Sequence, residues 1–223
     1  MDLKIVGAIR TNAAKNRSRI FRRYIANLPR PLSIVDLGGA SDMWKRWGVT
    51  ELDQLHLTLV NNHHIDKSHQ EEAPFGSYIQ KQTEDVLTLS PSFLKGFDLI
   101  FSNSMMEHLA SREAQLRLAA AIMQSGRPYF IQVPNKKSLV DPHFPHPFAP
   151  FFASFPMRLR AALLTLHSLG SGNRSPNYQE ALKRMRFYTP IGATDLKDIF
   201  PEAEIEIERI FGMPISLIAI RKR

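Results

Sequence analysis

The chain has 223 residues, of which 43% are hydrophobic, so it can bury a substantial core as one domain. It contains no cysteine, which excludes disulfides and thiolate metal sites, and no apolar run approaches the roughly 18 residues of a membrane-spanning helix. The apolar part of the first ten residues is too short for a signal peptide, so we expect a cytoplasmic protein.

The net charge of +8 is concentrated at the N-terminus. Residues 1–30 hold eight basic residues and one acidic residue, whereas residues 31–223 hold 21 basic and 20 acidic residues. Residues 15–28 show a helical period that gathers apolar side chains on one face, and Arg17 interrupts this pattern. We therefore expect residues 1–30 to form a basic amphipathic helical arm. It either packs on the body or contacts an anionic partner, which would be a phosphate-rich acceptor, a nucleic acid or a membrane surface.

After this arm, strand-like and helix-like segments alternate along the chain. The expected strands are 33–37, 55–60, 77–80, 98–102, 128–133, 204–210 and 215–220, and the expected helices are 42–48, 104–124 and 190–199. Such alternation indicates a parallel, doubly wound sheet. The turn at 211–214 is too short for a crossover, so the last two strands must be antiparallel. The prediction is an α/β fold with a mostly parallel, Rossmann-like seven-stranded sheet that ends in an antiparallel strand pair.

Polar or glycine residues follow each of the first four expected strands. In sheets of this kind, ligands bind beyond the carboxyl ends of the strands, and glycine turns let a backbone approach a ligand closely. The recurrence of such residues at four successive strand ends therefore predicts a cofactor site. The residues are Asp36, Gly38 and Gly39 at the first strand, Asn61 after the second, Asp85 and Val86 after the third, and Asn103 and Ser104 after the fourth.

The same segments carry a resemblance to a known family. VDLGGASDMW, LTLVNN, EDVLTL and FDLIFSNSMMEHL resemble the class I S-adenosylmethionine-dependent methyltransferases, in particular a bacterial group with a GG-x-x-x-x-W first motif. PYFIQVPNKKSLVDPHFPHPF is similar to that group's stretch after the fifth strand. The resemblance implies a class I methyltransferase domain over residues 31–223. The sequence departs from the wider superfamily at Ala40 and Asp42, where glycines are usual, and at Asn61, where an acid usually holds the ribose.

The resemblance also implies a role for each residue at the strand ends, with S-adenosyl-L-methionine as the cofactor. Three of them also have a purely structural alternative: Asp36 could cap a turn, Asn61 could be an ordinary turn residue, and Asp85 could start a loop. The implied contacts are Asp36 and Gly38–Gly39 at the methionine part, Asn61 at the ribose, Asp85 and Val86 at the adenine, and Asn103 and Ser104 at the methionine amine.

Methyl transfer requires alignment and, for a protonated acceptor, a base. Three histidines are candidate bases: His108, after the fourth strand, and His143 and His146, in the stretch DPHFPHPF. The last two could instead bind a metal together with Asp141, because imidazole and carboxylate groups suit divalent ions. His63, His64 and His69 are further candidate ligands for such a site. The prolines of this stretch indicate an extended loop, and we predict no metal site.

Residues 134–188, here called the insertion, separate the fifth and sixth strands and contain five phenylalanines between positions 144 and 155. We expect it to form an acceptor-binding lid, with Asp141, Phe144, Phe148 and Phe151 at the acceptor. Packing as a dimer or core element, and docking on a membrane, are the alternatives.

The expected activity is methyl transfer to oxygen or nitrogen of a small molecule, which would be a natural product, a sugar or a lipid-linked intermediate. The alternatives left open are an RNA or protein methyltransferase that uses the basic arm, and an inactive scaffold with the same fold. The choice between a monomer and a homodimer is also left open.

Overall fold

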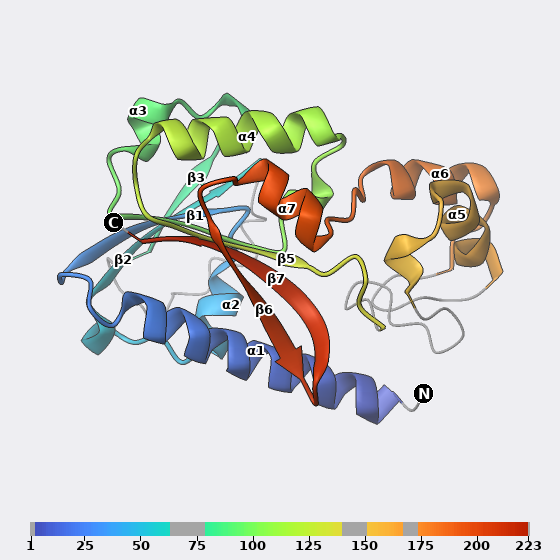
Figure 1. Cartoon of the computed structure of the whole chain (residues 1–223), viewed down its shortest axis with the longest axis horizontal. Helices are drawn as coiled ribbons and strands as arrows, with labels where there is room; N and C mark the ends of the chain where they lie inside the picture. Colours follow the sequence, from blue (N-terminus) through green and yellow to red (C-terminus); the bar gives the residue numbers. More distant parts are fainter. Residues whose placement is uncertain (1–2, 63–78, 140–150, 167–173, 223) are drawn as a thin grey trace.

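The structure is a computed structural model that describes residues 3–62, 79–139, 151–166 and 174–222 (Figure 1). A seven-stranded sheet with the order β3-β2-β1-β4-β5-β7-β6 forms its centre. The first five strands are parallel, and β7 runs antiparallel to both β5 and β6. The strands are β1 (Leu32–Leu37), β2 (Leu55–Asn61), β3 (Ile79–Thr83), β4 (Leu99–Asn103), β5 (Tyr129–Pro134), β6 (Glu204–Ile210) and β7 (Met213–Arg221).

The predicted fold class is confirmed, including the antiparallel pair at the end. Phe211 and Gly212 join β6 to β7 with φ angles of 51° and 79°, which is the backbone of a tight two-residue hairpin turn. The third strand overlaps the last two residues of the expected range 77–80 and continues to Thr83, because β3 is described from Ile79 to Thr83. Residues 77 and 78 lie outside the described residues.

Helices cover both faces of the sheet. Figure 1 shows α3, α4 and α7 on one face and α1 and α2 on the other. Within the described ranges, no helix is both long enough and apolar enough to cross a membrane. The helices are α1 (Leu3–Ile25), α2 (Ser41–Arg46), α3 (Pro91–Leu94), α4 (Arg112–Gln124), α5 (Met157–Leu166), α6 (Tyr178–Arg186) and α7 (Ala193–Ile199).

The expected helix 104–124 was placed too early in the chain, since α4 begins only at Arg112. Ser111 ends the preceding loop, because its Oγ accepts a hydrogen bond from the Ala114 N–H at 3.2 Å and so caps the helix. The residues before it form an irregular loop in which Ser104 has a φ of 55° and residues 106–108 make one 3-10 turn. This loop, rather than a helix, therefore follows β4.

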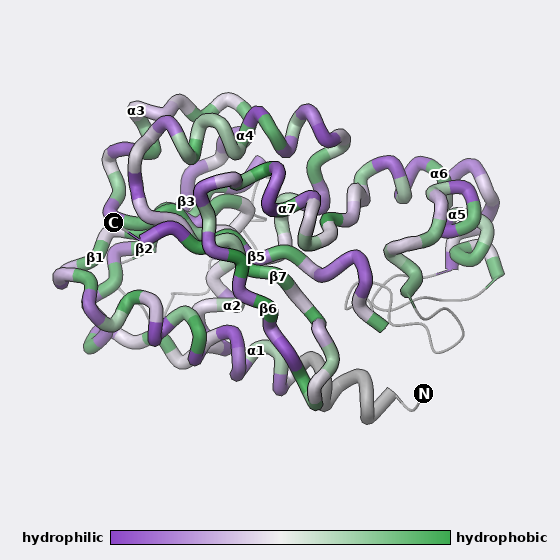
Figure 2. The backbone as a smooth tube through the Cα atoms, in the orientation of Figure 1, coloured by the Kyte–Doolittle hydropathy of each residue, from purple (hydrophilic) through white to green (hydrophobic). Residues whose placement is uncertain are grey.

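Helix α1 packs on the sheet through its apolar face. Phe21 is 1% exposed, and its ring lies 5.1–5.6 Å from four other aromatic rings, namely those of Trp44, Trp47, Phe101 and Phe130. Figure 2 shows the corresponding alternation of hydrophobic and hydrophilic residues along the coloured part of this helix. The structure therefore agrees with the first interpretation of the basic segment, in which it packs on the body.

The outer face of α1 is paired with acidic residues of the body. Arg22 Nη1 lies 2.6 Å from Asp53 Oδ1, and Arg23 Nη2 lies 2.6 Å from Glu206 Oε1. These contacts compensate part of the positive charge that the sequence concentrates in this segment.

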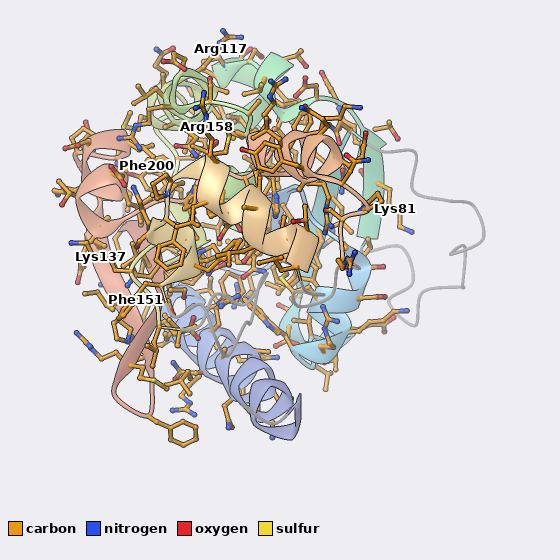
Figure 3. The ribbon with its side chains drawn as sticks, turned by 90° about the vertical axis from the view of Figure 1, so that its right-hand side faces the viewer. Lys81, Arg117, Lys137, Phe151, Arg158 and Phe200 are labelled. Atoms are coloured by element: carbon orange, nitrogen blue, oxygen red, sulfur yellow. The ribbon has the colours of Figure 1, made fainter. Side chains whose placement is uncertain are left out.

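The described part of the insertion forms a small helical unit with its own core. Helices α5 and α6 pack against each other around buried Phe152, Leu164 and Met185. Figure 1 shows this unit beyond the end of the sheet toward which β5 runs, and Figure 3, viewed from that side, shows α5 in front of the sheet. The insertion is therefore placed next to the carboxyl ends of the parallel strands.

Candidate active site at the carboxyl edge of the sheet

The carboxyl ends of β2, β1, β4 and β5 lie next to one another in the sheet order, which brings Asn61, Gly38 and Asn103 to one edge. Hydrogen bonds tie these ends together. The Gly38 N–H donates to the Val60 carbonyl at 2.8 Å, and the Ser102 hydroxyl donates to the Leu37 carbonyl at 3.0 Å. We call this region the carboxyl edge.

The two glycines after β1 are required by contacts inside the protein. Gly38 has a φ of 76°, and a Cβ at this position would overlap the Met105 side chain. A Cβ on Gly39 would overlap the carboxyl group of Asp36. The absence of a side chain therefore lets Met105 pack against Gly38 and lets the Asp36 carboxyl group pack against Gly39. From the sequence alone, the approach of a ligand or an ordinary tight turn could explain these glycines, but the two side chains that need the space could not be identified.

Asp36 is a buried acid at this turn, with 1% of its surface exposed. The Trp44 Nε1–H donates to its Oδ2 at 2.8 Å, and its Oδ1 has no hydrogen-bond partner among the described residues. Burial raises the pKa of Asp36 to about 7, although the Trp44 hydrogen bond acts in the opposite direction. The carboxyl group thus changes charge near neutral pH and retains one acceptor atom for a further donor.

Asp85, after β3, adopts the structural alternative considered for it. Asp85 Oδ1 accepts from the Leu87 N–H at 2.9 Å and starts the 3-10 turn Val86–Thr88. Val86 is 8% exposed and belongs to the core on the α4 face, which leaves little of it for a ligand ring. Asn61, at the end of β2, is half-buried. The expected adenine and ribose contacts of these three residues stay predictions.

Arg17 joins the carboxyl edge from α1, and this contact was missed at the sequence level. Its Nη1 donates to Asn103 Oδ1 at 2.8 Å, and its Nε and Nη2 donate to Glu208 Oε2 at 3.2 and 3.0 Å. Ser216 donates its hydroxyl to the same Glu208 oxygen. The available signal was that Arg17 interrupts the apolar face of its helix.

The Arg17 contact determines which way the Asn103 amide points. A guanidinium only donates hydrogen bonds, so the atom of Asn103 that faces it is the carbonyl oxygen. The NH₂ group is then the part of this side chain that is left for a ligand. We expected Asn103 to lie near an amine, whereas this orientation suits an acceptor such as a carboxylate.

A row of buried polar side chains continues from Asn103 along the α1 face of the sheet. Ser104 donates its hydroxyl to Gln132 Oε1 at 2.9 Å, and Gln132 and Glu208 are at most 1% exposed. In the described part of the chain, Gln132 Nε2 and Glu208 Oε1 have no hydrogen-bond partner, like Asp36 Oδ1. Buried polar atoms are normally paired, so a polar edge of this kind fits a polar ligand.

His108 is the one candidate base within the described residues. Its side chain is 48% exposed, and its Nε2 lies 4.0 Å from Oε1 of Glu107, which is almost fully buried. Its ring centroid lies 6.1 Å from that of Tyr188, at the end of the insertion. His108 is therefore located between the carboxyl edge and the insertion. The other candidate bases and most of the expected acceptor residues, which are Asp141, His143, Phe144, His146 and Phe148, lie outside the described residues.

A pocket of about 710 Å³ lies between the insertion and the body. Its walls come from Ala110 before α4, Lys136 after β5, the α5–α6 unit and the segment before α7. Phe155 lines it, whereas the expected acceptor residue Phe151 is 46% exposed and does not. Its volume is that of a typical small-molecule site. In the parts of the chain that the structure describes, no group of three His, Asp or Glu side chains could hold a metal ion.

Comparison by sequence finds no protein-family model and no curated protein that matches this chain. Comparison of structures finds many matches, all at low identity among those compared. A Rhodobacter sphaeroides protein named as a candidate Zn-dependent alcohol dehydrogenase is 11% identical with a TM-score of 0.56, and the match covers 94% of this chain and 98% of that one. A candidate O-methyltransferase from Nostoc punctiforme is 10% identical with a TM-score of 0.54, covering 93% and 56%.

Human N-acetylserotonin methyltransferase, solved with S-adenosylmethionine, is 14% identical with a TM-score of 0.52, and the match covers 93% of this chain and 51% of that one. The chain thus spans about half the length of these two methyltransferases. At such identities the comparison shows the fold alone. The chain has the seven-stranded, Rossmann-like fold of S-adenosylmethionine-dependent methyltransferases.

Proposed function

We propose that this protein is an S-adenosylmethionine-dependent methyltransferase that acts on oxygen or nitrogen of a small molecule. The observation that carries the proposal is the convergence of Gly38, Asn61 and Asn103 at adjacent strand ends, beside the unpartnered Oδ1 of Asp36. The fold likeness to methyltransferases supports the same assignment.

The residues at the carboxyl edge fit the polar groups of this cofactor, which when bound supplies a methyl group on a sulfonium. The Asn103 NH₂ group is available to the methionine carboxylate, and Asp36 Oδ1 is the acceptor available to the ammonium group. Asn61 would bind a ribose hydroxyl. The chain's own contribution is to bind and orient, because methyl transfer is an in-line displacement that needs no protein nucleophile.

His108 is the residue that we assign to take up the acceptor's proton. Its ring lies beside that of Tyr188, which lines the pocket, and the buried Glu107 carboxyl near its Nε2 would stabilise the protonated imidazole. A base in this position lies between the cofactor edge and the acceptor pocket.

A small-molecule acceptor is favoured over RNA or protein by two observations. The pocket has the volume of a small-molecule site, and the pairing of Arg22 and Arg23 with Asp53 and Glu206 reduces the positive charge that α1 offers to a nucleic acid. The remaining alternative, a scaffold without activity, differs in one measurable property, since it would bind no cofactor.

Calorimetry with S-adenosylmethionine and S-adenosylhomocysteine tests the proposal. We expect both to bind, and we expect Asn61→Ala to weaken binding at least about tenfold, because it removes a hydrogen bond to the ribose. Asn62→Ala is the matched control, since Asn62 is the next residue and is exposed. Asn61→Asp should retain binding, because an ionised acceptor forms a stronger hydrogen bond. The absence of heat at millimolar ligand would reject the methyltransferase and favour the scaffold.

A further inference from the structure

The insertion is strongly basic, in contrast to the domain that carries it. Residues 134–188 contain eight basic and two acidic residues, whereas the remainder of residues 31–223 contains 13 basic and 18 acidic residues. The near neutrality of residues 31–223 therefore conceals a positive insertion on a negative body. Figure 3 shows one of these basic residues, Arg158, on α5.

The positive charge of the insertion extends into the pocket. Three basic residues line it, namely Lys136, Arg160 and Arg186, and no acidic side chain of the described residues does. Glu180, the one acidic residue in the described part of the insertion, lies on α6 with its carboxyl group 2.8 Å from Lys183 Nζ. Within the described ranges, the insertion thus lines the pocket with cations and with no carboxylate.

The three cations differ in how firmly they are held. Arg160 is 6% exposed, its Nη1 donates to the Tyr188 carbonyl at 3.3 Å, and its guanidinium lies 5.5 Å from the centre of the Tyr188 ring. Arg160 therefore contributes a fixed charge next to an aromatic wall. Lys136 is half-buried and Arg186 is exposed, so the charged groups of these two side chains are available to a ligand.

Most of the rest of the wall is apolar and aromatic. Phe155 and Met185 line the pocket, and Phe187 contributes a ring that is 63% exposed. An exposed phenylalanine at the rim of a pocket gains by being covered, because apolar surface is removed from water. The pocket therefore combines aromatic surface with positive charge.

We propose that the pocket binds a small molecule with an aromatic or apolar body and an anionic group, either a carboxylate or a phosphate ester. The anion is held by Lys136 and Arg186 in the field of Arg160, and the body packs on Phe155 and Phe187. Charge-assisted hydrogen bonds are about twice as strong as neutral ones, so the anion contributes strongly to recognition. This inference rests on the proposed function only in that the bound molecule is the methyl acceptor.

The test measures binding of matched probes to the full chain without cofactor. The first pair is 3,4-dihydroxybenzoate and its neutral amide, and the second is phenyl phosphate and phenol, each titrated by calorimetry at two salt concentrations. We expect an anionic probe to bind at least about tenfold more tightly than its neutral partner, with an affinity that falls as salt rises. The pair with the larger ratio distinguishes the carboxylate from the phosphate ester.

Variants locate the anion. Lys136→Gln and Arg186→Gln should each reduce the affinity for the anionic probe several-fold and leave the neutral probe unchanged, whereas Lys137→Gln, an exposed neighbour outside the pocket, should change neither. Arg160→Lys keeps the charge of the buried position and should retain binding. Equal affinities within both pairs, no binding by any probe at millimolar concentration, or unchanged affinity in both glutamine variants would overturn the inference.

S-adenosylhomocysteine is titrated in parallel, so that the two proposals fail separately. Binding of the anionic probe without binding of S-adenosylhomocysteine would reject the methyltransferase and retain the anion site. The reverse result would retain the methyltransferase and reject the anion site.

Discussion

Replacement of Arg17 by methionine is expected to destabilise the protein far more than a surface arginine would. Arg17 is 11% exposed, and its partner Glu208 is fully buried. In the Arg17→Met variant, Glu208 keeps the Ser216 hydrogen bond but loses the cation. Breaking a buried ion pair from one side costs about 3–5 kcal/mol. For a chain of this size, that loss corresponds to a fall in melting temperature of about 6–20 °C.

Two further variants separate the ion pair from other effects. Arg23→Met, on the same helix, removes an exposed pair with Glu206 and should cost less than about 1 kcal/mol. The double variant Arg17→Met with Glu208→Gln removes the uncompensated charge and should recover most of the loss, because a neutral amide is cheaper to bury than a carboxylate.

The assay is urea unfolding followed by circular dichroism, together with calorimetry of S-adenosylhomocysteine binding well below the melting temperature. Arg17→Met should weaken that binding, because the Asn103 amide would no longer be held in one orientation. A free energy of unfolding no lower than that of Arg23→Met, or a double variant less stable than Arg17→Met alone, would refute the reasoning.

The remaining predictions concern the core and the glycine turn. The folded-state pKa of Asp36, about 7, lies above its value of 3.8 in model compounds, so protonation stabilises the fold. This stabilisation is complete below the unfolded pKa of 3.8 and is lost as the pH rises through 7. Between pH 5 and 8 the free energy of unfolding in urea should therefore fall by about 3 kcal/mol. Asp36→Asn should remove this fall, and parallel pH profiles of the two proteins would contradict the assignment. Phe21→Ala should lower the free energy of unfolding by about 3–5 kcal/mol, measured in the same way, because it empties the centre of an aromatic cluster; a loss below about 1 kcal/mol would contradict that packing. Gly38→Ala should abolish S-adenosylhomocysteine binding in calorimetry, since it displaces Met105, whereas Gly48→Ala, at a similar φ of 65° with no atom within 4 Å, should leave binding intact.

The fold could be predicted because its signals are local. Most of the strands are short apolar runs bounded by turn residues, and the short hairpin turn at 211–214 is enough to require an antiparallel end. The start of α4 was missed because the residues before Ser111 are compatible with a helix. In the structure, the positive φ of Ser104 and the cap at Ser111 make these residues a loop and begin the helix at Arg112.

The candidate site could be predicted only in part. Residues that follow a strand are predictable, because strand order places them at the carboxyl edge. Arg17 was missed because its partners Asn103 and Glu208 are 86 and 191 residues away in the sequence. The reason for each glycine was also missed, since the atoms that need the space belong to Met105 and to the Asp36 side chain.

The distribution of charge suggested a boundary at residue 30, but the contacts lead us to place α1 in the same folding unit as the sheet. Deleting residues 1–30 would remove Phe21 from between the rings of Trp44, Phe101 and Phe130 and would leave Glu208 buried without its cation. The net charge of a segment reflects its solvent-exposed side chains. The buried face of an amphipathic helix, in contrast, determines which folding unit the helix packs on. The arginine that interrupts that face is the residue that reaches the carboxyl edge. The basic helix is thereby connected to the proposed cofactor site through Arg17, in addition to its packing on the core.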